Sequence, residues 1–90
     1  MRERELELER VLKALANKRR LAIIRVIKNE KNPTVAHIAS KIKLSFRATS
    51  KHLLILAAAN IVEKNQHGLL VYNRLADNLP PVVRSTIVAL

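Results

Sequence analysis

Apolar positions recur with a helical period through most of the first sixty residues. Leu8, Val11, Leu12 and Leu15 follow one another at spacings of three, one and three residues. This spacing places them in one stripe on a helix. Three further segments before residue 60 and one after residue 80 are also rich in apolar positions. The pattern predicts five helices, at about 4–16, 18–31, 35–42, 46–59 and 81–89.

Helix-capping residues separate these segments. Asn17, Thr34 and Ser45 each stand one position before an expected helix, where their side-chain oxygens can accept hydrogen bonds from the first free backbone amides. Pro33 is expected to end the second helix, because proline cannot continue it. Asn60 stands where a residue of positive φ commonly ends a helix.

The period changes after Asn60. Residues 61–65 and 69–75 favour two β-strands, and Gly68, the only glycine, lies in the expected tip at 66–68, where a turn uses positive φ. The predicted fold class is therefore mainly α with a small β-hairpin. The order fits one winged helix-turn-helix domain over residues 1–90, with 35–42 and 46–59 as the helix-turn-helix and the hairpin as the wing.

The composition favours a small aliphatic core and a partner chain. Of the 90 residues, 49% are hydrophobic but only Phe46 and Tyr72 are aromatic, and none is cysteine. Disulfides and thiolate metal sites are thereby excluded. A core of this size is marginal alone, so we expect a homodimer formed by helices 4–16 and 81–90. The expected interface residues are Leu8, Val11, Leu12, Leu15, Val82, Val83, Ile87 and Leu90.

The charge distribution indicates a polyanionic partner. The net charge is +10, and no acidic residue occurs between Lys31 and Val62. Such a surface attracts nucleic acid or anionic lipid; the alternative is a basic surface that serves only solubility. No apolar run approaches the roughly 20 residues of a membrane span, and the charged N-terminus does not resemble a signal peptide. We therefore expect a cytoplasmic, nucleoid-associated protein.

The helix-turn-helix order predicts contacts with double-stranded DNA, because the second helix of this motif enters the major groove. Arg47 is expected to pair with guanine, and Lys51 with guanine or phosphate. Phe46 is expected either to pack under the turn or to contact a thymine methyl group. The full predicted set is Lys43, Ser45, Phe46, Arg47, Ser50, Lys51 and His52 from the turn and helix, and Lys64, Asn65, Gln66, His67 and Arg74 from the wing.

Several segments together resemble the ArsR-like winged-helix transcriptional regulators. The resemblance covers about residues 10–76 and implies a dimer, formed through the first and last helices, that binds a two-fold symmetric operator as a repressor. The segments that carry it are Leu12 to Ile24, Thr34 to Ala39, Leu44-Ser45, Ser50 to Leu53, Leu56, Ile61-Val62, Gly68, Tyr72 and Leu75.

The sequence departs from the metal-sensing members of that family. Thr34 and Ala36 stand where those members carry a Cys-x-Cys pair, and residues 79–90 contain no Asp or His for the sensor of the last helix. His37, His52 and His67 lie on three different elements without metal-ligand spacing. No cofactor and no metal are predicted. No catalytic residues are predicted either, because no nucleophile has an identifiable base.

Two alternatives remain open from the sequence. Leu54, Ala57, Ala58 and Leu69 occupy recognition-helix and wing positions that are usually polar or basic. An apolar surface there favours an additional protein partner, with the domain as an interaction module in a larger assembly. The other alternative is non-specific nucleic-acid binding, RNA included.

Overall fold

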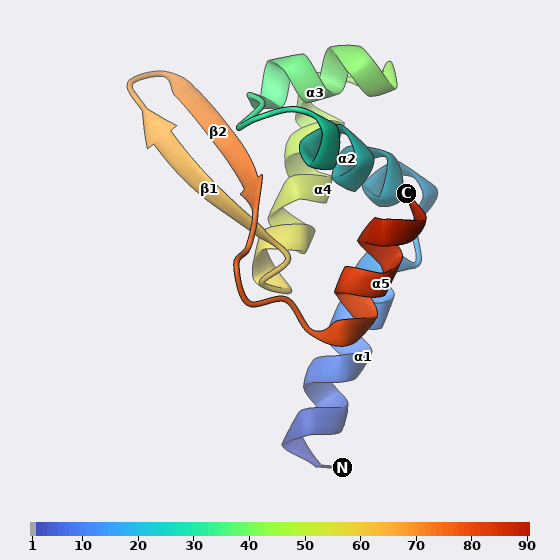
Figure 1. Cartoon of the computed structure of the whole chain (residues 1–90). Coiled ribbons are helices and arrows are strands. Elements are labelled where there is room, and N and C mark those ends of the chain that lie inside the picture. The colour runs from blue at the N-terminus through green and yellow to red at the C-terminus, as the bar shows by residue number, and fades with distance from the viewer. Residues whose placement is uncertain (1) are drawn as a thin grey trace.

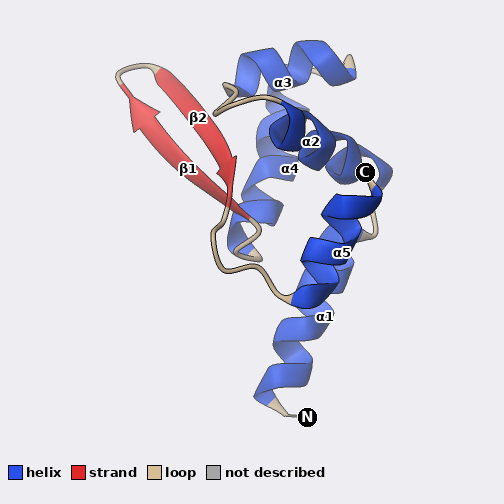
Figure 2. Ribbon diagram, in the orientation of Figure 1, coloured by secondary structure: helices blue, strands red, loops and turns tan. Residues whose placement is uncertain are grey.

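The computed structural model describes residues 2–90 and contains a two-stranded antiparallel hairpin among five helices (Figures 1 and 2). The predicted fold class, a winged helix-turn-helix, is confirmed. The elements in chain order are α1 (Glu3–Leu15), α2 (Lys18–Asn29), α3 (Val35–Ile42), α4 (Phe46–Ala58), β1 (Val62–His67), β2 (Leu70–Leu75) and α5 (Pro81–Ala89).

Side-chain caps begin three of the helices, as the sequence predicts. The Asn17 side chain accepts from two α2 amides at 3.0 and 3.1 Å. Thr34 Oγ1 accepts from the third residue of α3 at 3.2 Å, and Ser45 Oγ accepts from the third residue of α4 at 3.1 Å. Asn60 has the expected positive φ, 60°. These local bonds satisfy amides that have no partner within the helix.

One predicted helix boundary needs correction by two residues, and the helix ends at Glu3, Leu15 and Ala58 differ from the prediction by one residue. The second helix ends at Asn29 rather than at residue 31, because Glu30 is already extended and Asn32 has a positive φ of 47°. A residue before proline avoids helical geometry, so Pro33 alone would allow the helix to reach residue 31. The helix in fact ends two residues before that point, at Asn29.

The hairpin is longer and its turn tighter than predicted. The pairing runs from Val62 with Leu75 to His67 with Leu70, so the expected tip residues 66 and 67 belong to β1. The turn consists of Gly68 and Leu69, and of these only Gly68 has a positive φ, 63°. Glycine at the first of two turn positions is typical of a type II′ turn, whose twist matches the strands.

The core is aliphatic and centred on α2, which packs against all four other helices and β2 (Figure 1). Its fully buried hydrophobic residues come from α2, α3, α4, α5 and the bend before β1: Ile23, Ile24, Ile38, Leu53, Leu56, Ile61 and Val83. The buried positions of α4 are Thr49, Leu53 and Leu56. The opposite face of α4 is therefore left for other contacts.

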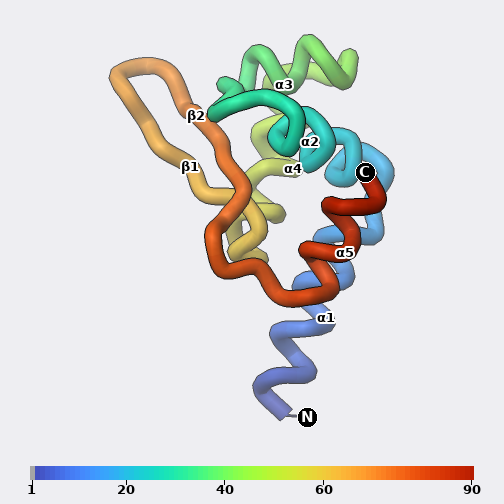
Figure 3. Tube along the Cα trace, viewed as in Figure 1, coloured from blue at the N-terminus to red at the C-terminus, as the bar shows by residue number. Residues whose placement is uncertain are grey.

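The wing is fixed to the start of the helix-turn-helix. Asn73 of β2 is fully buried and donates to the Pro33 carbonyl through both its backbone amide, at 3.0 Å, and its Nδ2, at 3.2 Å. Thr34 and Tyr72 form an isolated bridge beside these bonds. Figure 3 shows the connection between α2 and α3 passing close to β2. The wing and α3 are thus held at one fixed relative position.

Candidate nucleic-acid interface

The exposed start of α4 is the centre of the candidate interface. Ser45 caps it, and Thr49 Oγ1 donates back to the Ser45 carbonyl at 2.8 Å. The turn before it places Lys43 in the left-handed region with φ 55°, and the amide of Leu44 donates to the Ala39 carbonyl at 3.0 Å. Ala39 itself is buried between the helices. The turn and the cap together fix the direction in which α4 leaves α3.

The residues predicted to read DNA from this region lie at the surface. Lys43, Ser45, Phe46, Arg47 and Lys51 are exposed or partly exposed, and Ser50 is half-buried. Arg47 and Lys51 share one face because they are four residues apart on a helix. No ion pair among the described residues involves either of these two cations.

Phe46 does not pack under the turn, which was one of its two predicted positions. Its side chain is 59% exposed at the first residue of α4. Phe46 is therefore at the surface, next in sequence to the exposed residues Ser45 and Arg47.

His52 faces the scaffold rather than standing free on the helix. Its Nδ1 lies 3.2 Å from Arg20 of α2, whose guanidinium also donates to the carbonyls of Ala14 at 2.7 Å and Lys13 at 3.1 Å. Partial burial, followed by the charges of Arg20 and Arg19, lowers the pKa of His52 below its ordinary value. The neutral ring can accept from Arg20, so His52 connects α4 to the end of α1 through that arginine.

Four of the five wing residues predicted to contact DNA, Lys64 to His67, lie on β1, and all four are exposed. Successive strand residues point to opposite faces, so Lys64 and Gln66 share one face while Asn65 and His67 share the other. Asn65 and His67 line a groove of about 530 Å³ beside Lys31 and the α2–α3 connection. One flat nucleic-acid surface therefore cannot contact all four equally.

Two residues of the wing, Lys64 and His67, are affected by their surroundings. Partial burial of the ammonium group lowers the pKa of Lys64, although most of its side chain is exposed. The ring of His67 meets Tyr72 edge to face at 5.8 Å between centroids.

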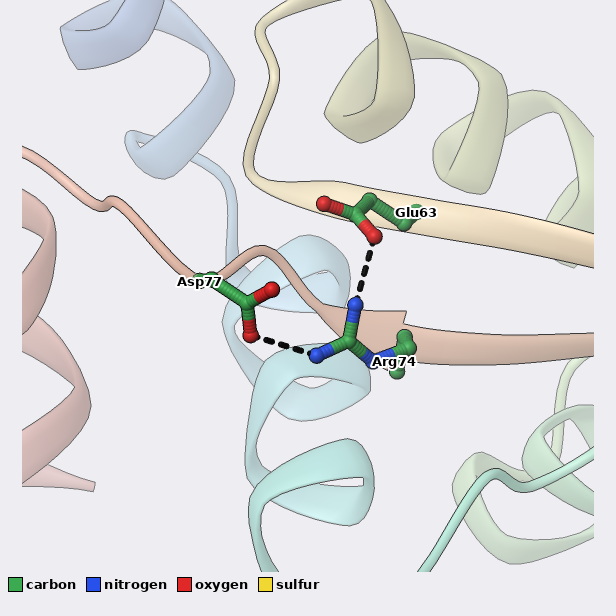
Figure 4. Close-up of polar contacts among 3 residues, drawn as sticks. All are labelled: Glu63, Arg74 and Asp77. Atoms are coloured by element: carbon green, nitrogen blue, oxygen red, sulfur yellow. Dashed lines mark hydrogen bonds and ion pairs between the residues drawn. The ribbon is translucent and has the colours of Figure 1, made fainter.

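Arg74, predicted to contact DNA, is instead held by two carboxylates. Its guanidinium nitrogens donate to Glu63 Oε2 and Asp77 Oδ1, each at 2.5 Å (Figure 4). The hydrogen bond and charge of Asp77, together with the charge of Glu63, raise the pKa of Arg74 above its ordinary value. Because these two carboxylates already pair with the guanidinium, they would compete with a DNA phosphate for Arg74. The predicted contact of Arg74 with DNA stays a prediction. The sequence spacing did not predict that Arg74 pairs with Glu63 and Asp77. The one indication was that Glu63 and Arg74 lie on the two strands of the predicted hairpin.

The terminal helices divide the predicted dimer residues into two groups. Leu8 and Leu12 are 45% exposed. Val82 and Ile87 of α5, and Leu90 directly after it, are partly buried. The other three are corrected, because they belong to the core of the chain itself: Val11, Leu15 and Val83.

Two further apolar residues of the terminal helices, which were not among the predicted interface residues, are also exposed. Val88 of α5 is 80% exposed and Leu6 of α1 is 50% exposed. α1 and α5 both lie away from the hairpin, and the first turns of α1 project beyond the rest of the chain (Figure 1). Both positions are apolar in the sequence, but the pattern did not show which side of each helix faces solvent and which faces the core.

Residues 2–90 contain no group of three or more His, Cys, Asp or Glu side chains placed to hold a metal ion. His37, one of the three histidines, pairs with Glu30 at 2.5 Å. In the same part of the chain no helix has the length and apolar character to cross a membrane.

Comparison with known proteins shows structural likeness without a close sequence relative. Neither a family model nor a curated protein matches the chain. HlyU from Vibrio cholerae aligns over 99% of this chain and 92% of its own, with a TM-score of 0.81 and 27% identity. The transcriptional repressor PagR of Bacillus anthracis aligns over 92% of this chain and 91% of its own, with a TM-score of 0.75 and 25% identity.

A third similar structure is the 1–100 fragment of a possible ArsR-family transcriptional regulator from Mycobacterium bovis, a homodimeric winged helix-turn-helix DNA-binding domain. It covers 99% of this chain and 83% of its own, with a TM-score of 0.81 and 28% identity. The resemblance drawn from the sequence is confirmed: the chain has the winged helix-turn-helix structure of the ArsR-like transcriptional regulators.

Proposed function

We propose that this protein is a DNA-binding transcriptional regulator that acts as a homodimer, without a thiolate metal sensor. The observation that carries the proposal is the capped start of α4, where Arg47 and Lys51 are exposed on one face. The segment from Lys31 to Val62, which contains the whole helix-turn-helix, has no acidic residue. A cationic helix end without carboxylates suits insertion between two phosphate strands.

Each residue has a specific role in this proposal. Arg47 reads a guanine edge, for which a bidentate guanidinium is well suited. Lys51 and Lys43 contact phosphates or guanine, and the face of β1 that carries Lys64 and Gln66 follows the neighbouring groove or backbone. Ser45 caps the helix and leaves its amides directed toward phosphate.

A homodimer would place two such helices in successive major grooves, roughly 34 Å apart. Leu8 and Leu12 on α1 and Val88 on α5 are exposed apolar residues available for this association. The similar fragment from Mycobacterium bovis is homodimeric, and the similar PagR is a repressor. We extend both properties to this chain: a dimer that binds a two-fold symmetric operator and represses transcription, in the cytoplasm at the nucleoid.

A salt titration of duplex binding tests the proposal. The logarithm of the affinity should fall linearly with the logarithm of salt concentration, because each neutralised phosphate releases counterions. Lys51→Ala should make this slope shallower by about one if Lys51 neutralises a single phosphate. Arg47→Ala should cost roughly 1–3 kcal/mol of binding free energy at the preferred site. Arg25→Ala, which removes an exposed arginine from α2, is the matched control and should change both quantities less.

A slope near zero would reject nucleic-acid binding altogether. Equal affinity for selected and random duplexes would instead favour a non-specific or architectural nucleic-acid binder, RNA included.

A second candidate is a protein-interaction module, favoured by the exposure of Leu54 and Leu69. Under this candidate Leu54→Ser would abolish capture of a stable partner, while Arg47→Ala and Lys51→Ala would leave duplex affinity unchanged. If the protein is instead a DNA-binding regulator, Arg47→Ala and Lys51→Ala should both weaken duplex binding.

A further inference from the structure

Phe46 has a position that the general requirements of DNA binding do not explain. It is the only phenylalanine in the chain and stands at the first residue of α4, 59% exposed. Two other residues of the same helix, Leu53 and Leu56, are fully buried in the core. The ring thus forgoes much of the stabilisation that burial of an aromatic side chain supplies.

The surroundings of the ring limit which partner can cover it. Lys43, Arg47 and Lys51 lie close by in sequence at the surface, and no acidic residue occurs in this part of the chain. Leu54, the next large exposed apolar residue on α4, lies eight residues further on, or about 12 Å along the axis. Phe46 is therefore a single apolar group framed by cations. A partner that fits it must present dense negative charge with an isolated apolar group.

Double-stranded DNA offers one such group in the major groove. Phosphates supply the negative charge, and the C5-methyl of thymine is the apolar group that projects from a base edge there. The N-terminal residues of a recognition helix are those that reach base edges. Phe46 belongs to this set because it is the first residue of α4.

We infer that Phe46 packs against a thymine methyl group in each half-site and so makes the protein select thymine at that position. This inference rests on the proposed DNA-binding function and adds a specificity-determining residue to it. Burying one methyl group increases the affinity about fourfold. Because a dimer makes this contact in both half-sites, the two factors multiply.

Uracil substitution tests the inference without altering the protein. Duplexes selected from a random pool are remade with each thymine of the half-site replaced in turn by uracil, which removes only the methyl group. The expected result is one thymine, or two adjacent ones, whose replacement weakens binding about fourfold per half-site. Phe46→Ala should bind the thymine and uracil duplexes equally.

Leu54→Ala is the matched control, because Leu54 is 60% exposed on the same helix. It should retain the full difference between thymine and uracil. The inference is overturned if no uracil replacement weakens the native protein, if Phe46→Ala shows the same sensitivity to uracil, or if the selected half-sites contain no thymine. If no duplex is bound at all, the proposed DNA-binding function itself fails. If duplexes are bound without any sensitivity to uracil, only the inference about Phe46 fails.

Discussion

Ser45 combines a structural and a surface role at the scale of one residue. Its Oγ accepts from the Ala48 amide at 3.1 Å, so Ser45→Ala should lower the free energy of unfolding by about 1 kcal/mol. Chemical denaturation measures this. Ser40→Ala removes an exposed serine within α3 and should change stability by less than about 0.5 kcal/mol. Equal effects of the two substitutions would contradict the capping role.

A second substitution at this position separates stability from binding. Aspartate caps helices about as well as serine, so Ser45→Asp should fold with nearly native stability. It should nevertheless weaken duplex binding, because it places a negative charge beside the phosphates. Reduced stability with unchanged affinity would place Ser45 away from the DNA.

Residue-scale features were predictable from the sequence where the interaction is local. The caps at Asn17, Thr34 and Ser45 involve amides two or three residues away, so sequence spacing alone locates them. The two ion pairs of Arg74 were not predicted, because they depend on strand pairing and on the path of the chain after β2. The outer and inner positions of α1 were not separated, because a stripe of leucines does not say which neighbour covers which residue.

At the scale of elements, Arg20 connects three helices. It donates to the last turn of α1, belongs to the first turn of α2, and lies 3.2 Å from His52 of α4. Sequence periodicity predicted the helices, but it did not predict this connection, because Arg20 and His52 are 32 positions apart. The orientation of α4 thus depends partly on an arginine that is also bonded to α1, the helix proposed to form the dimer.

This connection predicts a pH dependence of stability. The folded protein lowers the pKa of His52, so the unfolded chain binds this proton more readily. The stabilising contribution of neutral His52 is present above the unfolded value of about 6.5. It is lost as pH falls through the lower folded value. Urea midpoints measured from pH 7.5 downward should therefore decrease below about pH 6.5.

Histidine variants show whether His52 is responsible. His52→Gln removes the titrating group but keeps an oxygen that can accept from Arg20, so it should flatten the decrease. His67→Gln, which changes an exposed histidine of the wing, should leave the decrease in place. An unchanged pH profile in His52→Gln would contradict the account of this contact.

At the scale of the whole molecule, the exposed apolar surfaces of α1 and α5 indicate association. Leu12→Glu and Val88→Glu each place a charge on a residue that is already exposed in the single chain, so the fold should persist. Sedimentation equilibrium should show a dimer for the native protein and a shift toward monomer for both variants. Leu54→Glu, on α4, is the control and should remain dimeric. A native protein that is monomeric at all accessible concentrations would contradict the dimer.

The central claim is that two copies of α4, presented by a dimer, read a symmetric DNA site. Selection of bound duplexes from a random pool tests this most directly. The account predicts enrichment of an inverted repeat whose half-sites are centred about 10 base pairs apart, and no such enrichment with Arg47→Ala. Recovery of no preferred sequence, or of a preferred sequence that Arg47→Ala recovers equally well, would contradict it.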